Sequence, residues 1–365
     1  MRRSVLCAMM FIAVTLLGCG PAAPPEAAAV QPTLAATDPP PAPPAPPDAP
    51  APTATLTLTP APPTATPTNS APTPTPNPLA GWTIDDLAAR TYGGTGIPLG
   101  EVVKSEGSFT QYVMRYDSDG LTITGLANIP TGDGPFPTVI VAHGYCNPDT
   151  YWSGCDSVAV ADSLARYGYI ALAPDYRGYG ESDDGPNPFR IGYAIDVMNL
   201  AAQVSSLPQA SGAVGIIGHS MGGGVAQWPM VLQPDVVSAV VLYAAMSGDV
   251  ATNWRRIRMM WDTRSQDELA AIYGTPEENS EGYAAASPTS YLDRVAMPVM
   301  IHHGTADDQV PHQWSVELTT ALREAGKDVT FYSYEGEPHT FLGPTFNLFM
   351  SRNIAFFDEH LRSTP

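Results

Sequence analysis

A serine flanked by glycines could act as a nucleophile in this chain. Ser220 is the centre of the segment Gly-His-Ser-Met-Gly at 218–222. The apolar run 213–217 before it is typical of a buried strand, and the small residues 222–226 after it are typical of the start of a helix. A G-x-S-x-G segment between a strand and a helix forms a sharp turn that raises the serine hydroxyl off the sheet. We therefore predict that Ser220 is a catalytic nucleophile.

A serine nucleophile needs a base, and in this pattern the base is a histidine that follows an acidic residue along the chain. His339 directly follows the last predicted strand, and Pro338 before it favours a loop. His312 lies near a predicted helix start, and His360 lies inside the closing helix. We therefore predict that His339 is the general base.

The acidic residue should follow the preceding strand, because reacting groups gather at the carboxyl ends of strands in an α/β sheet. The loop after the strand predicted at 297–301 contains Asp307 and Asp308, and position alone fits either of them. His302 and His303 beside them could suggest a metal site. Adjacent strand residues point to opposite faces, however, and the sequence has no second ligand cluster. We expect neither a metal nor a cofactor.

Attack on a carbonyl produces an oxyanion that needs backbone donors. The turn supplies the amide of Met221, and a loop after an early strand should supply the second donor. His-Gly-Tyr at 143–145 occupies that place, so the amide of Tyr145 is the candidate, with a pocket-lining role for Tyr145 as the alternative. Cys146 and Cys155 are predicted to form a disulfide beside it, with two unpaired thiols as the alternative.

Alternating strands and helices would position these residues. Strands are predicted at 109–116, 121–129, 138–142, 169–173, 213–217, 236–243, 297–301 and 329–334. Helices are predicted at 82–87, 157–167, 191–202, from 222 onward, and at 314–325 and 346–361. The first two strands should be antiparallel. The later alternation favours the α/β class, with a mostly parallel central sheet and helices on both faces.

Residues 249–290 interrupt this alternation with helical patches and no clear strand. We predict that they form a small lid insertion over the strand ends. Arg255, Arg256 and Arg258 are interpreted as a solvated helix face rather than a reader of carboxylates. Arg177 is interpreted as a structural salt-bridge partner rather than a substrate clamp.

The N-terminal part of the 365-residue chain has a different composition. Residues 1–19 contain two arginines, an apolar run and Leu-Gly-Cys, which resembles the export signal of bacterial lipoproteins with Cys19 as the lipidated residue. An ordinary cleaved signal peptide is the alternative. Residues 20–80 hold more than half of the 39 prolines and few large apolar residues, which predicts a disordered linker. Residues 81–365 are long enough for one substantial domain. We expect an extracytoplasmic protein, either secreted or held at the cell surface.

The formal net charge of −19 argues against a nucleic-acid partner and against a basic membrane-binding patch. We expect contact with a membrane only through the N-terminal lipid anchor.

Several motifs in order along the chain resemble those of the prolyl oligopeptidase family of α/β-hydrolases. They are His-Gly-Tyr at 143–145, Asp-Tyr-Arg-Gly-Tyr-Gly-Glu-Ser at 175–182, Gly-His-Ser-Met-Gly at 218–222, His-Gly-Thr-Ala-Asp-Asp at 303–308, and His339. The resemblance covers about residues 109–361. It implies an α/β-hydrolase fold, serine hydrolysis without a metal, and a catalytic role for Asp307 with Asp308 in support. Classical members carry a β-propeller ahead of this domain, where this chain has a predicted linker, so the resemblance does not by itself imply the proline-directed specificity of the family.

The sequence thus predicts a serine hydrolase that cleaves a small peptide through an acyl-enzyme, with a carboxylesterase of the same fold as the alternative. A non-catalytic binding module at the cell surface is the alternative from a different class.

Overall fold

The computed structural model describes residues 78–362. The predicted export signal with Cys19, and the predicted linker up to residue 77, lie outside the described residues. Within 78–362 no helix is long and apolar enough to cross a membrane.

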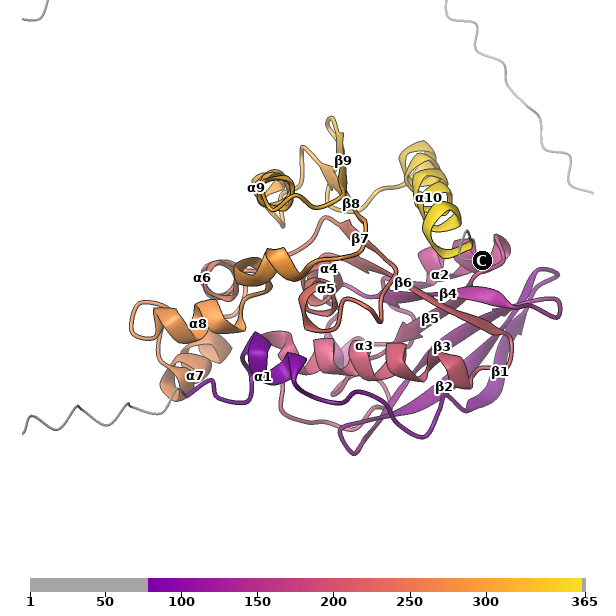
Figure 1. The fold of residues 1–365 in the computed structure, drawn as a ribbon, viewed down its shortest axis with the longest axis horizontal. Coiled ribbons are helices and arrows are strands. Elements are labelled where there is room, and N and C mark those ends of the chain that lie inside the picture. The colour runs from indigo at the N-terminus through magenta and orange to yellow at the C-terminus, as the bar shows by residue number, and fades with distance from the viewer. Residues whose placement is uncertain (1–77, 363–365) are drawn as a thin grey trace, which may run out of the picture. The chain divides into compact units, whose positions relative to one another are not determined.

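A nine-stranded sheet forms the centre of the described part (Figure 1). The strands are β1 (Leu99–Ser105), β2 (Phe109–Ser118), β3 (Leu121–Pro130), β4 (Phe136–Ala142), β5 (Ile170–Pro174), β6 (Ala210–His219), β7 (Ala239–Tyr243), β8 (Val299–Gly304) and β9 (Val329–Tyr334). Their order across the sheet is β1-β2-β3-β5-β4-β6-β7-β8-β9. The pairs β1–β2, β2–β3 and β3–β5 are antiparallel, and all others are parallel. The prediction of a mostly parallel sheet is confirmed.

Helices cover both faces of this sheet. The α-helices of the described part are α1 (Ile84–Ala88), α2 (Val158–Arg166), α3 (Ile191–Gln203), α4 (Met221–Val225), α5 (Gln227–Leu232), α6 (Val250–Met260), α7 (Thr263–Tyr273), α8 (Ser280–Ala286), α9 (His312–Glu324) and α10 (Gly343–Phe357). Ile140 of β4 packs in the core beneath α3 and α5, whereas its neighbour Val139 packs in the core beneath α2 and α10. Successive side chains of a strand point to opposite faces, so a strand covered on both sides becomes continuously apolar.

Two local features differ from the sequence-based expectation. Strand β1 was not expected, and most of its residues are exposed at the edge of the sheet, so no apolar alternation marks it. The helix after Ser220 is divided into α4 and α5. Pro229 lies in the first turn of α5 and has no amide hydrogen to donate to Val225, which ends α4.

Residues 249–290 form the helices α6, α7 and α8, and the structure assigns no strand in this range. Figure 1 shows the three helices, in orange, grouped at one side of the sheet. Asp249 caps the start of α6, where its carboxylate accepts a hydrogen bond from the amide of Thr252 at 2.6 Å. The exposed pairs Arg255–Glu277 and Arg258–Asp267 agree with a solvated face, whereas Arg256 is partly buried and donates to the carbonyl of Gln309.

Candidate active site

Ser220 occupies a strained turn between β6 and α4. Its backbone angles are φ 52° and ψ −116°, which a residue with a side chain rarely adopts. The Ser220 amide donates to the carbonyl of Tyr243 at 2.9 Å, and its own carbonyl accepts from the amide of Met246 at 2.9 Å. Tyr243 is the last residue of β7, and Met246 lies three residues after it. The end of the neighbouring strand therefore holds the turn in place.

The glycines on both sides of Ser220 are required by close backbone approaches. A Cβ atom added to Gly222 would lie 2.1 Å from the carbonyl oxygen of Ala142, and one added to Gly218 would lie 2.3 Å from the carbonyl oxygen of Gly222. No rearrangement of a flexible side chain could relieve these contacts, because the obstructing atoms are backbone atoms. This crowding explains why the turn needs the pattern G-x-S-x-G.

His339 and Asp307 are in direct contact. Nδ1 of His339 lies 2.7 Å from Oδ2 of Asp307, whose side chain is fully buried. A carboxylate can only accept a hydrogen bond here, so Nδ1 carries the proton and Nε2 is left as an acceptor. Ser220 and His339 line the same pocket. The described residues contain no hydrogen bond between the Ser220 hydroxyl and the His339 ring, and such bonds commonly tighten only when substrate binds.

The loop after β8 holds the Asp307 carboxylate with several donors. The amides of Gln309 and Val310 both donate to Oδ1 at 2.9 Å, and Nε2 of His303 lies 3.0 Å from Oδ2. Burial raises the pKa of Asp307, but the bonds from His303 and His339 outweigh it and hold the pKa well below its usual range. Asp308 is exposed, and its carboxylate makes no hydrogen bond or ion pair with the described residues. The geometry therefore distinguishes two aspartates that spacing left equivalent.

His302 and His303 point in opposite directions, as adjacent strand residues should. His302 packs its ring 4.9 Å from that of Phe349, and its Nδ1 meets the hydroxyl of Tyr334 at 2.8 Å. Burial and the nearby charge of Arg352 lower the pKa of His302 to about 3, so this imidazole is neutral. Within 78–362 no cluster of three or more histidine, cysteine or acidic side chains could hold a metal ion.

A pocket of about 590 Å³ surrounds Ser220 and His339. It is lined by Gly144, Tyr145, Asp156, Arg190, His219, Ser220, Met221, Met246, Ile257, Trp261, Asp262, Gln309, His339 and Thr340. Helix α6 and the two residues after it contribute Ile257, Trp261 and Asp262. The predicted insertion therefore forms one wall of this pocket.

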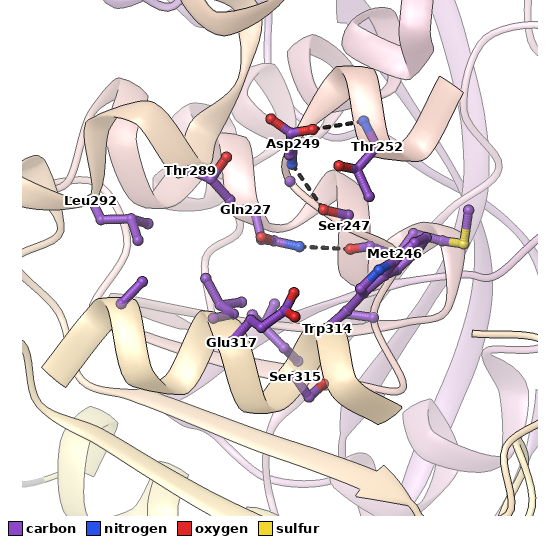
Figure 2. A pocket seen from close by; sticks show the side chains of 15 residues that line it. Gln227, Met246, Ser247, Asp249, Thr252, Thr289, Leu292, Trp314, Ser315 and Glu317 are labelled. Carbon is purple, nitrogen blue, oxygen red and sulfur yellow. Dashed lines mark hydrogen bonds between the residues drawn. The ribbon is translucent and has the colours of Figure 1, made fainter. Parts of the chain in front are cut away.

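A smaller cavity of about 230 Å³ adjoins this region and shares Met246 with it. Figure 2 shows Trp314 and Glu317 of α9 facing Gln227 and the start of α6 across this space. The amide of Gln227 donates to the carbonyl of Met246 at 2.8 Å (Figure 2). Asp249 and Glu317 are among the described residues that line this cavity, and no histidine is.

The two predicted oxyanion donors lie at the edge of the larger pocket. The amides of Tyr145 and Met221 have no acceptor among residues 78–362, which leaves both able to bind a ligand oxygen. Tyr145 itself lines the pocket and is 64% exposed as a residue. The amide of Gly144 is already occupied, because it donates to Oδ2 of Asp156 at 2.5 Å.

Asp156 and His219 form a second acid–imidazole pair that the sequence did not reveal. Nδ1 of His219 lies 2.9 Å from both carboxylate oxygens of Asp156, and its Nε2 lies 3.2 Å from the carbonyl oxygen of His339. Both partners are pure acceptors, so both ring nitrogens must donate and the ring carries a positive charge. Asp156 directly follows the predicted disulfide and His219 directly precedes Ser220, but neither neighbour predicts the contact.

Electrostatics agree with this protonation. Burial lowers the pKa of His219, but the charge of Asp156 and the bonds to Asp156 and His339 outweigh it, and the pKa is raised. Burial raises the pKa of Asp156, but His219 and the amide of Gly144 bring it down to about 2. The side chain of His219 is 11% exposed and that of Asp156 is 22% exposed, so solvent screens the pair only in part.

Cys146 and Cys155 are joined by a disulfide, with their Cα atoms 6.6 Å apart. The bridge connects the residue after Tyr145 to the residue before Asp156. It therefore ties together both ends of the loop that carries a candidate oxyanion donor and the partner of His219.

Comparison with protein families gives one match. The family model described as the prolyl oligopeptidase family matches residues 156–364. This stretch includes the segment around Ser220, the loop with Asp307, and His339.

Two curated relatives illustrate the range of similar proteins. The mitochondrial palmitoyl-protein thioesterase ABHD10 of Homo sapiens is 22% identical over 209 residues, which cover 54% of this chain and 64% of the relative. The uncharacterized peptidase YtmA of Bacillus subtilis (strain 168) is 24% identical over 236 residues, which cover 63% of this chain and 86% of the relative. The chain thus spans less than two thirds of the thioesterase.

Solved structures share the fold. The dipeptidyl peptidase 4 of Porphyromonas gingivalis superposes with a TM-score of 0.55 at 20% identity, over 70% of this chain and 36% of the peptidase. The acetyl xylan esterase 1 of Thermoanaerobacterium sp. JW/SL YS485 superposes with a TM-score of 0.56 at 19% identity, over 78% of this chain and 95% of the esterase. At these identities the likeness shows the α/β-hydrolase fold.

Proposed function

The chain belongs to the prolyl oligopeptidase family, and on this basis we propose that it is a serine hydrolase that cleaves acyl bonds through Ser220, His339 and Asp307. One observation carries the assignment of these residues. The bond from His339 to the buried Asp307 carboxylate orients an imidazole in the same pocket as a serine in a strained turn.

The reaction follows from the positions of these groups. Nε2 of His339 takes the proton of Ser220 as Oγ attacks the substrate carbonyl, and the amides of Tyr145 and Met221 donate to the oxyanion. The tetrahedral intermediate collapses as the imidazolium gives its proton to the leaving amine or alcohol, which leaves an acyl-enzyme. Water then attacks the acyl-enzyme with His339 again as base, and an acid is released with Ser220 restored.

The substrate class proposed first is a small peptide, in agreement with the peptidases among the relatives. A carboxylic ester is the second candidate, because the chain covers 95% of the acetyl xylan esterase but only 36% of the dipeptidyl peptidase. Parallel assays of an aminoacyl 4-nitroanilide and a short-chain 4-nitrophenyl ester separate the two. The peptidase proposal requires a kcat/KM for the anilide that depends on its amino-acid side chain.

Labelling by a fluorophosphonate probe tests the nucleophile directly. Wild-type protein should be labelled, and Ser220→Ala should lose the label. Ser211→Ala is the matched control, since Ser211 lies on an exposed stretch of β6 outside the pocket, and it should be labelled like wild type. An unlabelled wild type that binds a ligand tightly would instead support a non-catalytic binding module.

We further propose that residues 1–19 direct export and that Cys19 becomes the lipidated N-terminus, which anchors the protein outside the cytoplasm. The Cys146–Cys155 disulfide supports this, because such bonds persist in oxidising compartments. Radiolabelled palmitate should appear in the wild type expressed in a bacterial host and be absent from Cys19→Ser. Equal labelling of both would contradict the anchor.

A further inference from the structure

Arg190 brings a positive charge to the wall of the pocket that contains Ser220 and His339. It also lines a neighbouring cavity of about 370 Å³ beneath α6 and α7, so it stands where the two spaces meet. Its side chain makes no hydrogen bond or ion pair with another described residue. The guanidinium has five N–H donors that cannot be deprotonated in a protein.

The other arginines that are at least partly buried have partners. Arg177 pairs with Asp196, and Arg256 donates to the carbonyl of Gln309 at 2.7 Å. The remaining pairs are Arg90 with Asp119, Arg294 with Asp85, and Arg352 over the rings of Tyr332 and Tyr334. Withdrawing a charge from water without a partner costs free energy, and a bound anion would recover that cost.

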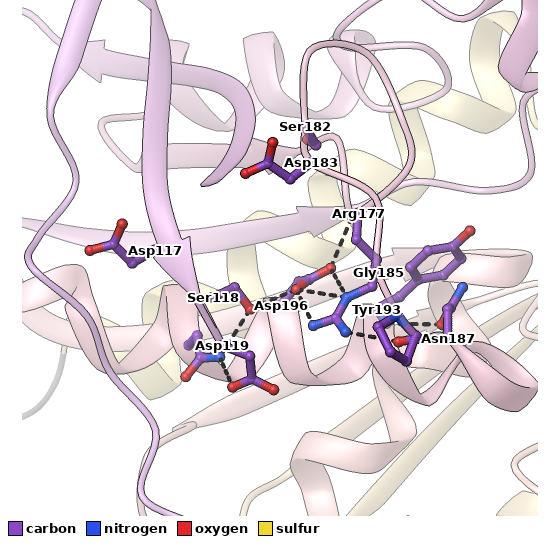
Figure 3. A network of polar contacts seen from close by, with 12 residues as sticks. Asp117, Ser118, Asp119, Arg177, Ser182, Asp183, Gly185, Asn187, Tyr193 and Asp196 are labelled. Carbon is purple, nitrogen blue, oxygen red and sulfur yellow. Dashed lines mark hydrogen bonds and ion pairs between the residues drawn. The ribbon is translucent and has the colours of Figure 1, made fainter. Parts of the chain in front are cut away.

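The backbone around Arg190 is held rigidly. Arg190 and Phe189 before it both have left-handed backbone angles, with φ of 68° and 52°. Arg177 pairs with Asp196 (Figure 3) and donates to the carbonyl of Pro186, four positions before Arg190, at 2.8 Å. The side chain of Asn187 accepts the amide of Tyr193 in the first turn of α3. Two consecutive strained residues persist only where the surroundings impose them, and such strain gathers at functional sites.

Arg190 is surrounded by tyrosines and one carboxylate. Burial lowers the pKa of Arg190, while Tyr193, Tyr179, Asp262 and Tyr145 act in the opposite direction. The carboxylate of Asp262 is occupied at the start of α7, where it accepts the amide and hydroxyl of Ser265. The negative charge of Asp262 thus weakens the positive potential of Arg190 in the pocket, although the two side chains form no ion pair.

The other charges of the pocket do not compete for an anion. Asp156 is neutralised by His219, as described above. The overall net charge of −19 disfavours anions at long range, but salt screens exposed charges beyond ~8 Å at physiological ionic strength. Attraction of an anionic group inside the pocket must therefore come from Arg190.

We propose that Arg190 forms an anion subsite, and that the preferred substrates carry a carboxylate at a distance from the scissile acyl bond. This rests on the proposed function of Ser220. The planar guanidinium would bind the carboxylate with two parallel hydrogen bonds, while the scissile carbonyl lies at Ser220. The tyrosines around Arg190 would exclude water from this ion pair.

Two matched pairs of esters test the subsite. In the first, the carboxylate is on the acyl part: mono(4-nitrophenyl) glutarate against 4-nitrophenyl pentanoate. In the second, it is on the leaving group: 3-carboxyphenyl acetate against phenyl acetate. In at least one pair, Arg190→Gln should lower the ratio of kcat/KM for the acidic over the neutral ester by about 10- to 100-fold, the range for a hydrogen bond to a charged group. Arg190→Lys should give a ratio between those of the wild type and Arg190→Gln. Lysine keeps the positive charge but cannot form the two parallel hydrogen bonds of a guanidinium.

Two further variants sharpen the test. Asp262→Asn removes the opposing charge and should raise the ratio, whereas Arg255→Gln, on the exposed outer side of α6, should leave it unchanged. An unchanged ratio in both pairs for Arg190→Gln would overturn the subsite. If the fluorophosphonate probe does not label the wild type, the proposed hydrolase function is wrong. This result differs from an unchanged ratio in a labelled enzyme, so failure of the subsite and failure of the hydrolase function can be told apart.

Discussion

The carboxylate of Asp156 contacts Nδ1 of His219 at 2.9 Å, and Nε2 of the same ring reaches the carbonyl oxygen of His339 at 3.2 Å. One charged imidazole therefore links the loop that carries Tyr145 to the backbone of the proposed base. The pair does not touch the reacting atoms. Its effect is to position the groups that do.

The first prediction concerns the pH dependence of this pair. The lowered pKa of Asp156, about 2, means that its stabilisation is present above its unfolded pKa of ~3.9 and is lost as the pH falls. The raised pKa of His219 means that its stabilisation is complete below an unfolded pKa of ~6.5 and is lost as the pH rises through the folded value. Asp156→Asn should therefore lower the free energy of unfolding most between pH ~4 and ~6.5, by about 1.5–3 kcal/mol.

Urea unfolding at a series of pH values measures this difference. Asp149→Asn is the matched control, because Asp149 is exposed in the same loop and its carboxylate makes no hydrogen bond or ion pair with a described residue. A difference for Asp156→Asn that stays constant from pH 3 to 9 would refute a charged His219.

The second prediction separates the two neighbouring aspartates. Asp307→Asn removes the acceptor that sets the tautomer of His339, and kcat should fall by about 10⁴-fold, as for the aspartate of other serine triads. Asp308→Asn alters an exposed side chain and should change kcat less than ~3-fold, because surface substitutions are usually nearly neutral. Steady-state kinetics on the same ester measure both. Comparable losses in the two variants would show that Asp307 has been assigned wrongly.

The third prediction concerns the disulfide. Opening the Cys146–Cys155 bridge by the double substitution to serine should destabilise the protein by about 2–3 kcal/mol, the range expected for closing a loop of this length. The freed loop would hold the Tyr145 amide less well, so kcat should fall more than KM rises. Thermal unfolding and ester kinetics check the two effects. Dithiothreitol should reproduce them in the wild type and leave the double variant unaffected.

The fourth prediction contrasts a buried ion pair with an exposed one. Arg177 and Asp196 are 3% and 0% exposed, whereas Arg264 in its pair with Glu268 is 91% exposed. Arg177→Met leaves a buried carboxylate without its partner and should cost about 3–5 kcal/mol of unfolding free energy, and Arg264→Met should cost none that is measurable. The double variant Arg177→Met/Asp196→Leu should recover part of the loss. Urea unfolding provides the measurement, and equal effects of the two single variants would contradict it.

Much of the architecture could be predicted from local patterns. The apolar runs at β4, β5, β6 and β8 predict strands, and the structure confirms them, with each strand lying between two helix layers. Strand β1 escaped prediction because its exposed residues show no alternation, and its pairing with β2 decides its conformation. An apolar pattern in the sequence therefore predicts a strand only where the strand is buried, because burial requires apolar side chains.

The candidate site divides in the same way. The type and order of Ser220, Asp307 and His339 are visible in the sequence, because a strained strand-to-helix turn needs glycines and a base must come from a later loop. Their catalytic roles remain predictions. Spacing could not choose between Asp307 and Asp308, since both follow β8. The choice depends on which carboxylate turns inward to His303 and His339.

The sequence by itself determined the fold class, the family and the residue types that can perform acyl chemistry, because these leave marks at fixed spacing along the chain. Only the tertiary structure decided that Asp156 meets His219, 63 positions away, and that Arg190 faces the pocket of Ser220 without a side-chain partner within 78–362. Such contacts arise where loops from separate strands converge at one edge of the sheet. Their geometry depends on the packing of the whole domain, and no local pattern records it.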